Sequence, residues 1–236
     1  MMKAKETIRR LRELEFVSPL QDLRLKGVEG YIHHSERQID QIVRRVVFGE
    51  KIPHEEKQFS IFEPHTEWIS KGKAGVPQEL GLRVCVVKDQ NGFILHHQVM
   101  EKQTDDKVAI TLAQETKSRF PNFIGCSYDK GFYTPQNREE LQKVLDFVAL
   151  PKKGRLSKKD QEIEHSEEFI EARRKHSSVE SSINALENHG LDRCRDHGLH
   201  GFKRYVGLAV LARNLEILGA FILAKKRKQE NRLKAA

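Results

Sequence analysis

The sequence predicts a mixed α/β protein with an open sheet flanked by helices, and two observations carry this prediction. Residues 82–100 contain two β-rich runs separated by Asp89-Gln90-Asn91-Gly92, which is typical of a hairpin. Helical patterns and strand-like runs then alternate as far as residue 223. Strands that alternate with helices favour a sheet covered by helices.

The segment 1–56 is predicted to be basic and helical. Apolar residues recur at helical spacing in two runs, Ile8, Leu11 and Leu14, then Ile39, Ile42, Val43 and Val46. Gly49 and Pro53 end the second run.

The segment 57–224 is predicted to be the main domain. After the hairpin, Thr104 or Asp105 can cap a helix that runs to about Arg119, and Pro121 ends it. The remaining elements are expected at 122–129 (strand), 136–145 (helix), 146–150 (strand), 161–188 (one long helix) and 202–223 (a last, apolar helix). Residues 225–236 form a basic tail.

Composition indicates a cytoplasmic protein. Of the 236 residues, 38% are apolar and 32% are charged, which is typical of a polar globular chain. We expect no membrane partner, because no apolar run approaches the roughly 18 residues of a membrane span. The N-terminus has no apolar core of a secretory signal. The three cysteines, Cys85, Cys126 and Cys194, are expected to be reduced thiols.

Positive charge is clustered. The net charge is +8, and it gathers in "IRRLRELEF", "PKKGRLSKK", "ARRKH" and "AKKRKQENRLK". Such clusters fit a polyanion such as nucleic acid, but solvated helix faces and a charged tail give the same pattern.

Two carboxylates stand out by their position. Asp129 follows a strand, where open α/β sheets place their sites, although an Asp before Gly131 is also an ordinary turn. Glu180 lies at the border of an apolar helical stripe, with basic and small polar neighbours. Such a setting suits a divalent cation, and an ordinary exposed glutamate on an amphipathic helix is the alternative.

Five blocks resemble the C-terminal half of bacterial insertion-sequence DDE transposases of the ISNCY-type group. They are "FSIFEPHTEWISKGKAGVPQELGLRV", "EKQTDD", "SYDKGF", "LPKKGRLSK" and "RRKHSSVESSINALENHGLDRC…HGFKRYVGLAVLARNL". The resemblance runs from about His34 to Arg227. It implies an RNase H-like catalytic domain and a location at the bacterial nucleoid.

The resemblance also implies chemistry. Asp129 resembles the second acid of the triad and Glu180 the third, both as catalytic residues and as ligands of Mg²⁺ or Mn²⁺. The implied partners are DNA, as element ends and target, and a second copy in a transposition complex. The residues implied for DNA binding are Lys130, Lys152, Lys153, Arg173, Arg174, Lys175 and His176. Related families carry an arginine where this chain has His176 and a lysine where it has Glu187.

The first acid of the triad is missing from its expected setting. The family carries it on the first strand of the sheet, whereas the upstream region here is basic helix. We therefore expect a truncated transposase that lacks this strand and is inactive alone. The segment Gln58–Phe62 is the one nearby stretch apolar enough to replace the strand.

Two alternatives remain open. One is a non-catalytic, transposase-derived DNA-binding protein. The other is a self-sufficient nuclease in which Glu63 or Glu67 substitutes for the first acid.

Overall fold

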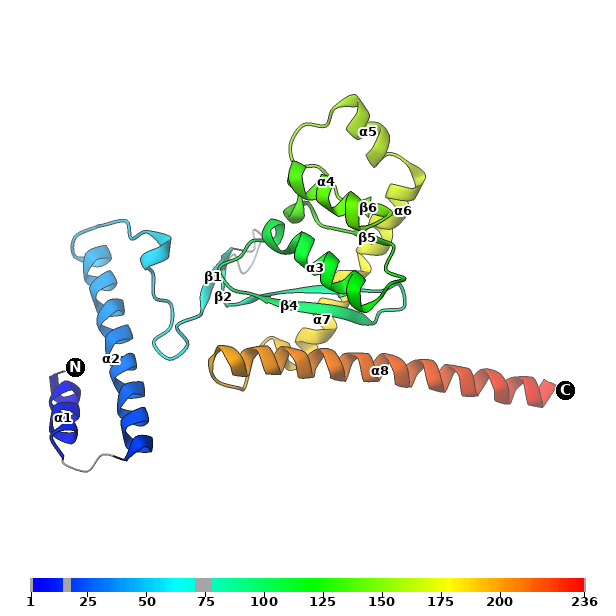
Figure 1. Cartoon of the computed structure of the whole chain (residues 1–236). Helices are drawn as coiled ribbons and strands as arrows, with labels where there is room; N and C mark the ends of the chain where they lie inside the picture. The colour runs from blue at the N-terminus through cyan, green and yellow to red at the C-terminus, as the bar shows by residue number, and fades with distance from the viewer. Residues whose placement is uncertain (1, 15–17, 71–77, 236) are drawn as a thin grey trace. The chain divides into compact units, whose positions relative to one another are not determined.

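The chain divides into two compact units, Met1–Leu82 and Arg83–Ala236. The computed structural model describes residues 2–14, 18–70 and 78–235. Figure 1 traces the chain from blue at the N-terminus to red at the C-terminus. The boundaries suggested by composition, after residues 56 and 224, stay predictions.

The first unit is helical at its start, as predicted. Its elements are α1 (Met2–Arg12), α2 (Pro19–Val46), a short 3-10 turn η1 (His54–Glu56) and the antiparallel pair β1 (Glu67–Ser70) and β2 (Gln78–Gly81). α2 begins at Ser18, whose side chain accepts a hydrogen bond from the Gln21 N–H while the Gln21 side chain bonds back. Arg12 joins α1 to α2 through Glu29, at 2.6 Å. The segment Gln58–Phe62 forms no strand, so the prediction that it could replace one is wrong.

The second unit begins with the predicted hairpin, β3 (Arg83–Lys88) and β4 (Ile94–Met100). α3 (Asp105–Arg119) follows with Thr104 at its N-cap, as expected. The next elements are β5 (Gly125–Ser127), the 3-10 turn η2 (Lys130–Phe132), α4 (Pro135–Val144) and β6 (Phe147–Ala149). The last are α5 (Lys158–Glu164), α6 (Glu167–His176), α7 (Ser178–Leu186), the π-type turn η3 (Glu187–Leu191) and α8 (Gly198–Ala235).

The strands do not join into one open sheet, which differs from the predicted layout. Within the described residues they form three two-stranded sheets, and β5 pairs with β6 in parallel. On its outer edge β4 meets α8, because the Asn214 side chain bonds the backbone of Ile94. No described strand pairs with the other edge of β3 or with the second edge of β5.

The core of the second unit lies on both sides of the hairpin. On one side, Val108 and Leu112 of α3 pack against Cys85, Val87 and Met100. The adjacent face of α3 packs its alanines, Ala109 and Ala113, into a cluster with Tyr128, Leu141, Leu145 and Leu150. On the other side of the hairpin, Ile94 packs against Leu186, Ala209 and Val210. Figure 1 shows α3 and α8 on opposite sides of β4.

The predicted single helix over 161–188 is wrong, since three helices with two breaks occupy this region. Ser166 caps α6 by accepting a hydrogen bond from the Phe169 N–H. At the second break, the hydroxyls of Ser177 and Ser178 donate to the carbonyls of Arg174 and Lys175. Serine hydroxyls compete in this way with the helical ladder, which apolar periodicity does not reveal.

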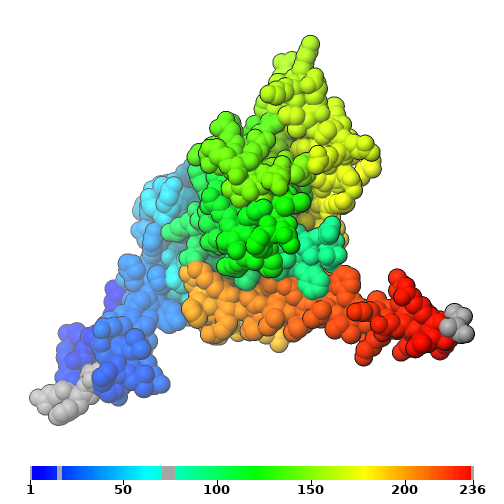
Figure 2. Space-filling model, turned by 45° about the vertical axis from the view of Figure 1, so that its right-hand side comes forward, coloured from blue at the N-terminus to red at the C-terminus, as the bar shows by residue number. Residues whose placement is uncertain are grey.

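The last helix is longer than predicted, because α8 continues through the basic tail to Ala235. In Figure 2 its orange-to-red end extends beyond the rest of its unit. Among the described helices, it alone is long and apolar enough to cross a membrane by length and composition. The expectation that no segment meets this test is therefore corrected.

Candidate functional site

The site begins where β5 ends. Asp129 comes two residues after Ser127, the last residue of β5, and the chain turns at once into η2. The backbone N–H of Tyr128 still bonds to Ala149, which extends the pairing with β6 by one residue. Asp129 therefore leaves a fixed strand end, and its side chain is 67% exposed to solvent.

The last turn of α6 binds this strand end. The Nε2 atom of His176 lies 3.2 Å from Oδ1 of Asp129, and its Nδ1 atom shares a hydrogen bond of 2.9 Å with Oγ of Ser127. Arg173 donates to the Tyr128 carbonyl at 2.9 Å and lies 3.8 Å from Oδ1 of Asp129. One carboxylate oxygen of Asp129 thus faces two basic side chains.

Asp105 belongs to the same region, which the sequence reasoning missed. A Cβ placed on Gly131 would come 2.5 Å from Oδ2 of Asp105, so this carboxylate packs directly on the glycine. Burial, with a smaller contribution from the negative charges of Asp105 and Asp129, raises the pKa of the Cys85 thiol to about 12. Both carboxylates are therefore close enough to Cys85 to disfavour its thiolate form.

Glu180 lies in the first turn of α7, four residues after His176. Its side chain is exposed and forms no hydrogen bond or ion pair with any described residue. The nearby N-terminus of α7 is attached to β3, since Lys88 donates to both the carbonyl and the hydroxyl of Ser178 at 2.8 Å. The junction between α6 and α7 thus contacts the ends of two strands.

The basic residues predicted for DNA binding differ in their contacts. Arg173, Arg174, Lys175 and His176 form the last turn of α6, where cations also interact favourably with the helix dipole. Lys175 pairs with Glu171 at 2.7 Å. Lys153 donates to the Gly131 carbonyl at 2.9 Å and so reaches the same strand end, whereas Lys152 pairs with Asp160 at 2.5 Å.

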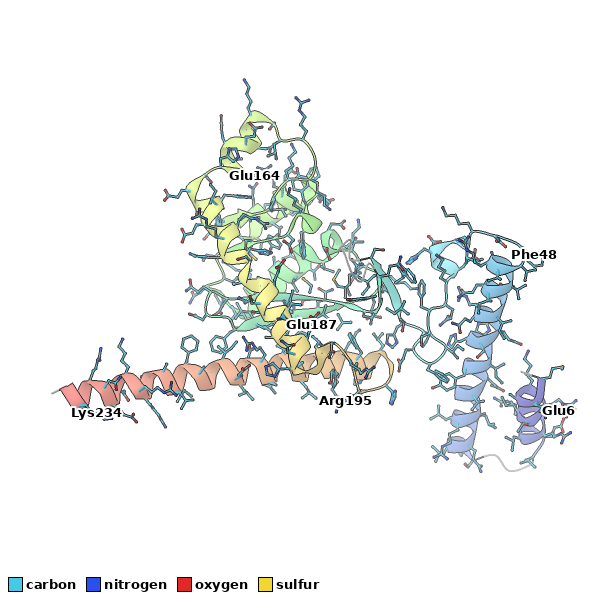
Figure 3. The ribbon with its side chains drawn as sticks, turned by 180° about the vertical axis from the view of Figure 1, so that it is seen from behind. Glu6, Phe48, Glu164, Glu187, Arg195 and Lys234 are labelled. Carbon is cyan, nitrogen blue, oxygen red and sulfur yellow. The ribbon has the colours of Figure 1, made fainter. Side chains whose placement is uncertain are left out.

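A second basic feature lies between α7 and α8, where Figure 3 labels Glu187 and Arg195. A pocket of about 440 Å³ opens there, lined by His189, Gly190, Asp192, Arg193, Arg195 and Tyr205. Its sequence signal is weak, because Asp192 and Asp196 flank the two arginines and offset their charge.

A comparison with models of known protein families identifies the family of this chain. Residues 49–215 match the family model described as "Transposase DDE domain", which covers 167 of the 236 residues. The chain belongs to the DDE transposase family. No curated protein and no solved structure gives a significant match to this transposase. DNA is the substrate of the family, and its members generally use divalent metal ions.

The carboxylates of the described residues do not make the expected metal site by themselves. A two-metal site for phosphoryl transfer needs several carboxylate oxygens around ions about 4 Å apart. Among the described residues, no group of three or more His, Cys, Asp and Glu side chains could hold a metal ion. Oδ1 of Asp129 instead faces His176 and Arg173.

Proposed function

We propose that this transposase chain binds DNA through its phosphates at the carboxyl end of β5 and does not cut DNA on its own. In this proposal Asp129 and Glu180 are two acids of the triad, and Mg²⁺ or Mn²⁺ is the metal of the complete site. The third acid comes from outside the described residues. The observation that carries the proposal is the set of basic side chains from α6 around Asp129, where the described residues offer no group of three or more His, Cys, Asp and Glu side chains that could hold a metal ion.

The strand edges support an incomplete RNase H-like sheet. β4 has its outer edge on α8, and β5 is paired with β6, so β3 and β5 each retain one edge without a described strand. A strand placed between them would lie under α3, which packs against both parts of the core. Each buried backbone group left without a partner costs about 1–3 kcal/mol, so we expect modest stability for the chain alone.

The arginines at the end of α6 are suited to bind phosphate. Arginine presents a planar fork of donors that suits phosphate oxygens, and Arg174 is exposed at the end of α6. Arg173 already bonds the Tyr128 carbonyl, which holds its guanidinium near the exposed carboxylate. Bound DNA would place a phosphate beside Asp129, with its negative charge offset by these cations.

A salt titration of DNA binding tests this proposal. We expect fluorescence anisotropy with a labelled duplex of arbitrary sequence to show affinity that falls steeply with salt, because phosphate contacts release counterions. The variant Arg174→Ala should lose affinity by about the same factor for all DNA sequences. The slope of its log affinity against log salt concentration should be smaller in magnitude by about 1. Lys143→Ala is the control, since Lys143 is paired with Glu140 on α4. An affinity that is insensitive to salt would contradict the proposal.

The alternative of a non-catalytic DNA-binding protein rests on the same missing acid. The two readings differ in the role of Asp129. If the catalytic site is completed by a strand from another polypeptide, the upstream part of a related transposase, added in trans, should restore Mg²⁺-dependent cleavage. Asp129→Ala should then abolish that cleavage. If restoration fails while DNA binding is retained, the non-catalytic alternative is favoured.

A further inference from the structure

The pocket between η3 and α8 shares no lining residue with the site at Asp129. It has a volume of about 440 Å³, and its wall includes Gly190 and Tyr205. Gly190 has a φ of 103°, and the Tyr205 hydroxyl donates to its carbonyl at 3.2 Å. A Cβ at residue 190 would come 3.1 Å from the tyrosine oxygen, so both the backbone and the space favour glycine there. The turn thus holds the tyrosine on the wall of the pocket.

The two arginines of the pocket have unused hydrogen-bond donors. Arg193 and Arg195 are exposed, and their side chains form no hydrogen bond or ion pair with any described residue. The carboxylate next to Arg195, that of Asp196, is already occupied, since it accepts from Arg204 and from the backbone N–H of His197. Figure 3 labels Arg195 in the connection before α8. A guanidinium group presents a planar fork of donors that matches phosphate oxygens, so two of them in one pocket suit a phosphate.

The rest of the lining suits a nucleoside. The Tyr205 ring lines the pocket, and nucleic-acid bases of every kind stack on aromatic rings. Asp192 is exposed, and its carboxylate forms no hydrogen bond or ion pair with any residue that the structure describes. It can therefore accept from the amino group of a base or from a sugar hydroxyl. His189 instead pairs with Glu216, at 3.2 Å.

We propose that the pocket binds a nucleoside 5′-monophosphate, with its phosphate on Arg193 and Arg195 and its base against the Tyr205 ring. Asp192 then accepts from the base or from the sugar. The volume of about 440 Å³ lies within the range of roughly 300–1,000 Å³ that is typical of small-molecule sites. This ligand has two sources, a free nucleotide and the 5′-terminal nucleotide of a DNA strand. The inference does not depend on the DNA binding proposed for α6.

Neither a bare anion nor paired DNA uses the whole pocket. An inorganic phosphate satisfies the arginines, but it places a second negative charge near Asp192 and leaves the tyrosine ring unused. A phosphate within a duplex also reaches the arginines, but its base is paired and stacked inside the double helix. An unpaired nucleotide brings a phosphate, a base and a hydroxyl together. The contribution of Tyr205 therefore distinguishes this ligand from general phosphate binding.

Isothermal titration calorimetry of the full chain with 5′-dAMP, deoxyadenosine and inorganic phosphate tests the proposal. We expect dAMP to bind at least roughly tenfold more tightly than either of the other two, because each of them lacks part of the contacts. Arg195→Ala should weaken dAMP binding by a similar factor. The matched control is Arg155→Ala, because Arg155 is also exposed and its side chain also contacts no described residue. No binding of dAMP, equal binding of dAMP and inorganic phosphate, or an equal effect of the two variants would overturn the proposal.

Two variants of Tyr205 test the stacking surface. Tyr205→Phe keeps the ring and should retain most of the affinity for dAMP. Tyr205→Ala removes the ring and should bind dAMP no more tightly than inorganic phosphate, while its affinity for inorganic phosphate stays unchanged. Thermal unfolding followed by circular dichroism checks that both variants are folded. A folded Tyr205→Ala chain that binds dAMP as tightly as the natural chain would contradict the proposed base contact.

Competition identifies the source of the nucleotide. The probe is the deoxynucleoside 5′-monophosphate of 2-aminopurine, whose fluorescence falls when its base stacks. The competitors are one single-stranded oligonucleotide with a 5′-phosphate and the same strand with a 5′-hydroxyl. Displacement by the phosphorylated strand alone would assign the pocket to a strand end, and displacement by neither strand would assign it to a free nucleotide. Equal displacement by both strands would show that internal phosphates occupy the pocket, which contradicts the proposal.

Discussion

Asn214 binds both backbone polar groups of Ile94, although 120 residues separate the two in the sequence. The Oδ1 atom of Asn214 accepts from the Ile94 N–H at 2.9 Å, and its Nδ2 atom donates to the Ile94 carbonyl at 2.9 Å. The side-chain amide takes the place of a neighbouring strand along the outer edge of β4. This contact ends the hairpin sheet on the α8 side.

Replacing Asn214 by alanine should destabilise the second unit by about 1–3 kcal/mol, because the buried backbone of Ile94 loses both partners. Chemical denaturation measures this change. The amide of Ile94 should also lose protection in hydrogen exchange. Asn184→Ala is the control, since Asn184 is exposed on α7. Equal stability of the two variants would show that the edge contact contributes nothing.

The variant Gly131→Ala should be destabilised by less than about 1 kcal/mol, because the new methyl group overlaps the end of the Asp105 side chain, which is 40% exposed and can turn away. The double variant Asp105→Ala/Gly131→Ala should lose less stability than the sum of the two single changes. Gly27→Ala on α2 serves as the control, since no atom lies within 4 Å of a Cβ placed there. Additive single changes would mean that the two residues do not press on each other.

Asp160 should make stability depend on pH. Its carboxylate accepts from Lys152 at 2.5 Å, Ser157 at 2.6 Å and Arg138 at 2.7 Å, and these bonds hold its pKa well below the usual range. Because the folded pKa is depressed, the stabilisation is fully present above the unfolded value of about 3.9 and is lost as pH falls through the folded value.

Thermal melts of the natural chain and of Asp160→Asn at a series of pH values measure this effect. We expect the variant to melt at a lower temperature at pH 7, and the difference to shrink below pH of about 4. The exposed carboxylate of Asp146 provides the control variant, Asp146→Asn. A difference that stays constant down to pH 2 would contradict the assignment.

Local features of the fold could be predicted from the sequence. The hairpin β3–β4 and the helix α3 were predicted from strand alternation, an Asn-Gly turn and a threonine at the N-cap position, all of which are signals within a few residues. The Thr104 side chain itself makes no capping hydrogen bond. The break between α6 and α7 could not be predicted from periodicity, because it coincides with the hydroxyls of Ser177 and Ser178. The helix predicted over 202–223 was shorter than α8. Apolar periodicity ends where the charged residues begin, but these residues continue the helix.

The candidate site was predicted only in part. The position of Asp129 after a strand was confirmed. Its contact with His176 joins segments 47 residues apart, and the packing of Asp105 on Gly131 joins the start of α3 to η2, so neither leaves a local signal. Glu63 and Glu67 belong to the first unit, and a role for either as a substitute acid stays a prediction.

Incubation of supercoiled plasmid with the purified chain and Mg²⁺ or Mn²⁺ tests the central claim most directly. Conversion to nicked circles measures cleavage without knowledge of the element ends, and a mobility shift in the same samples measures binding. We expect DNA to be bound at low salt and to remain supercoiled, because the described residues hold no cluster of three metal-binding side chains. Metal-dependent nicking by the natural chain that disappears in Asp129→Ala would contradict this account.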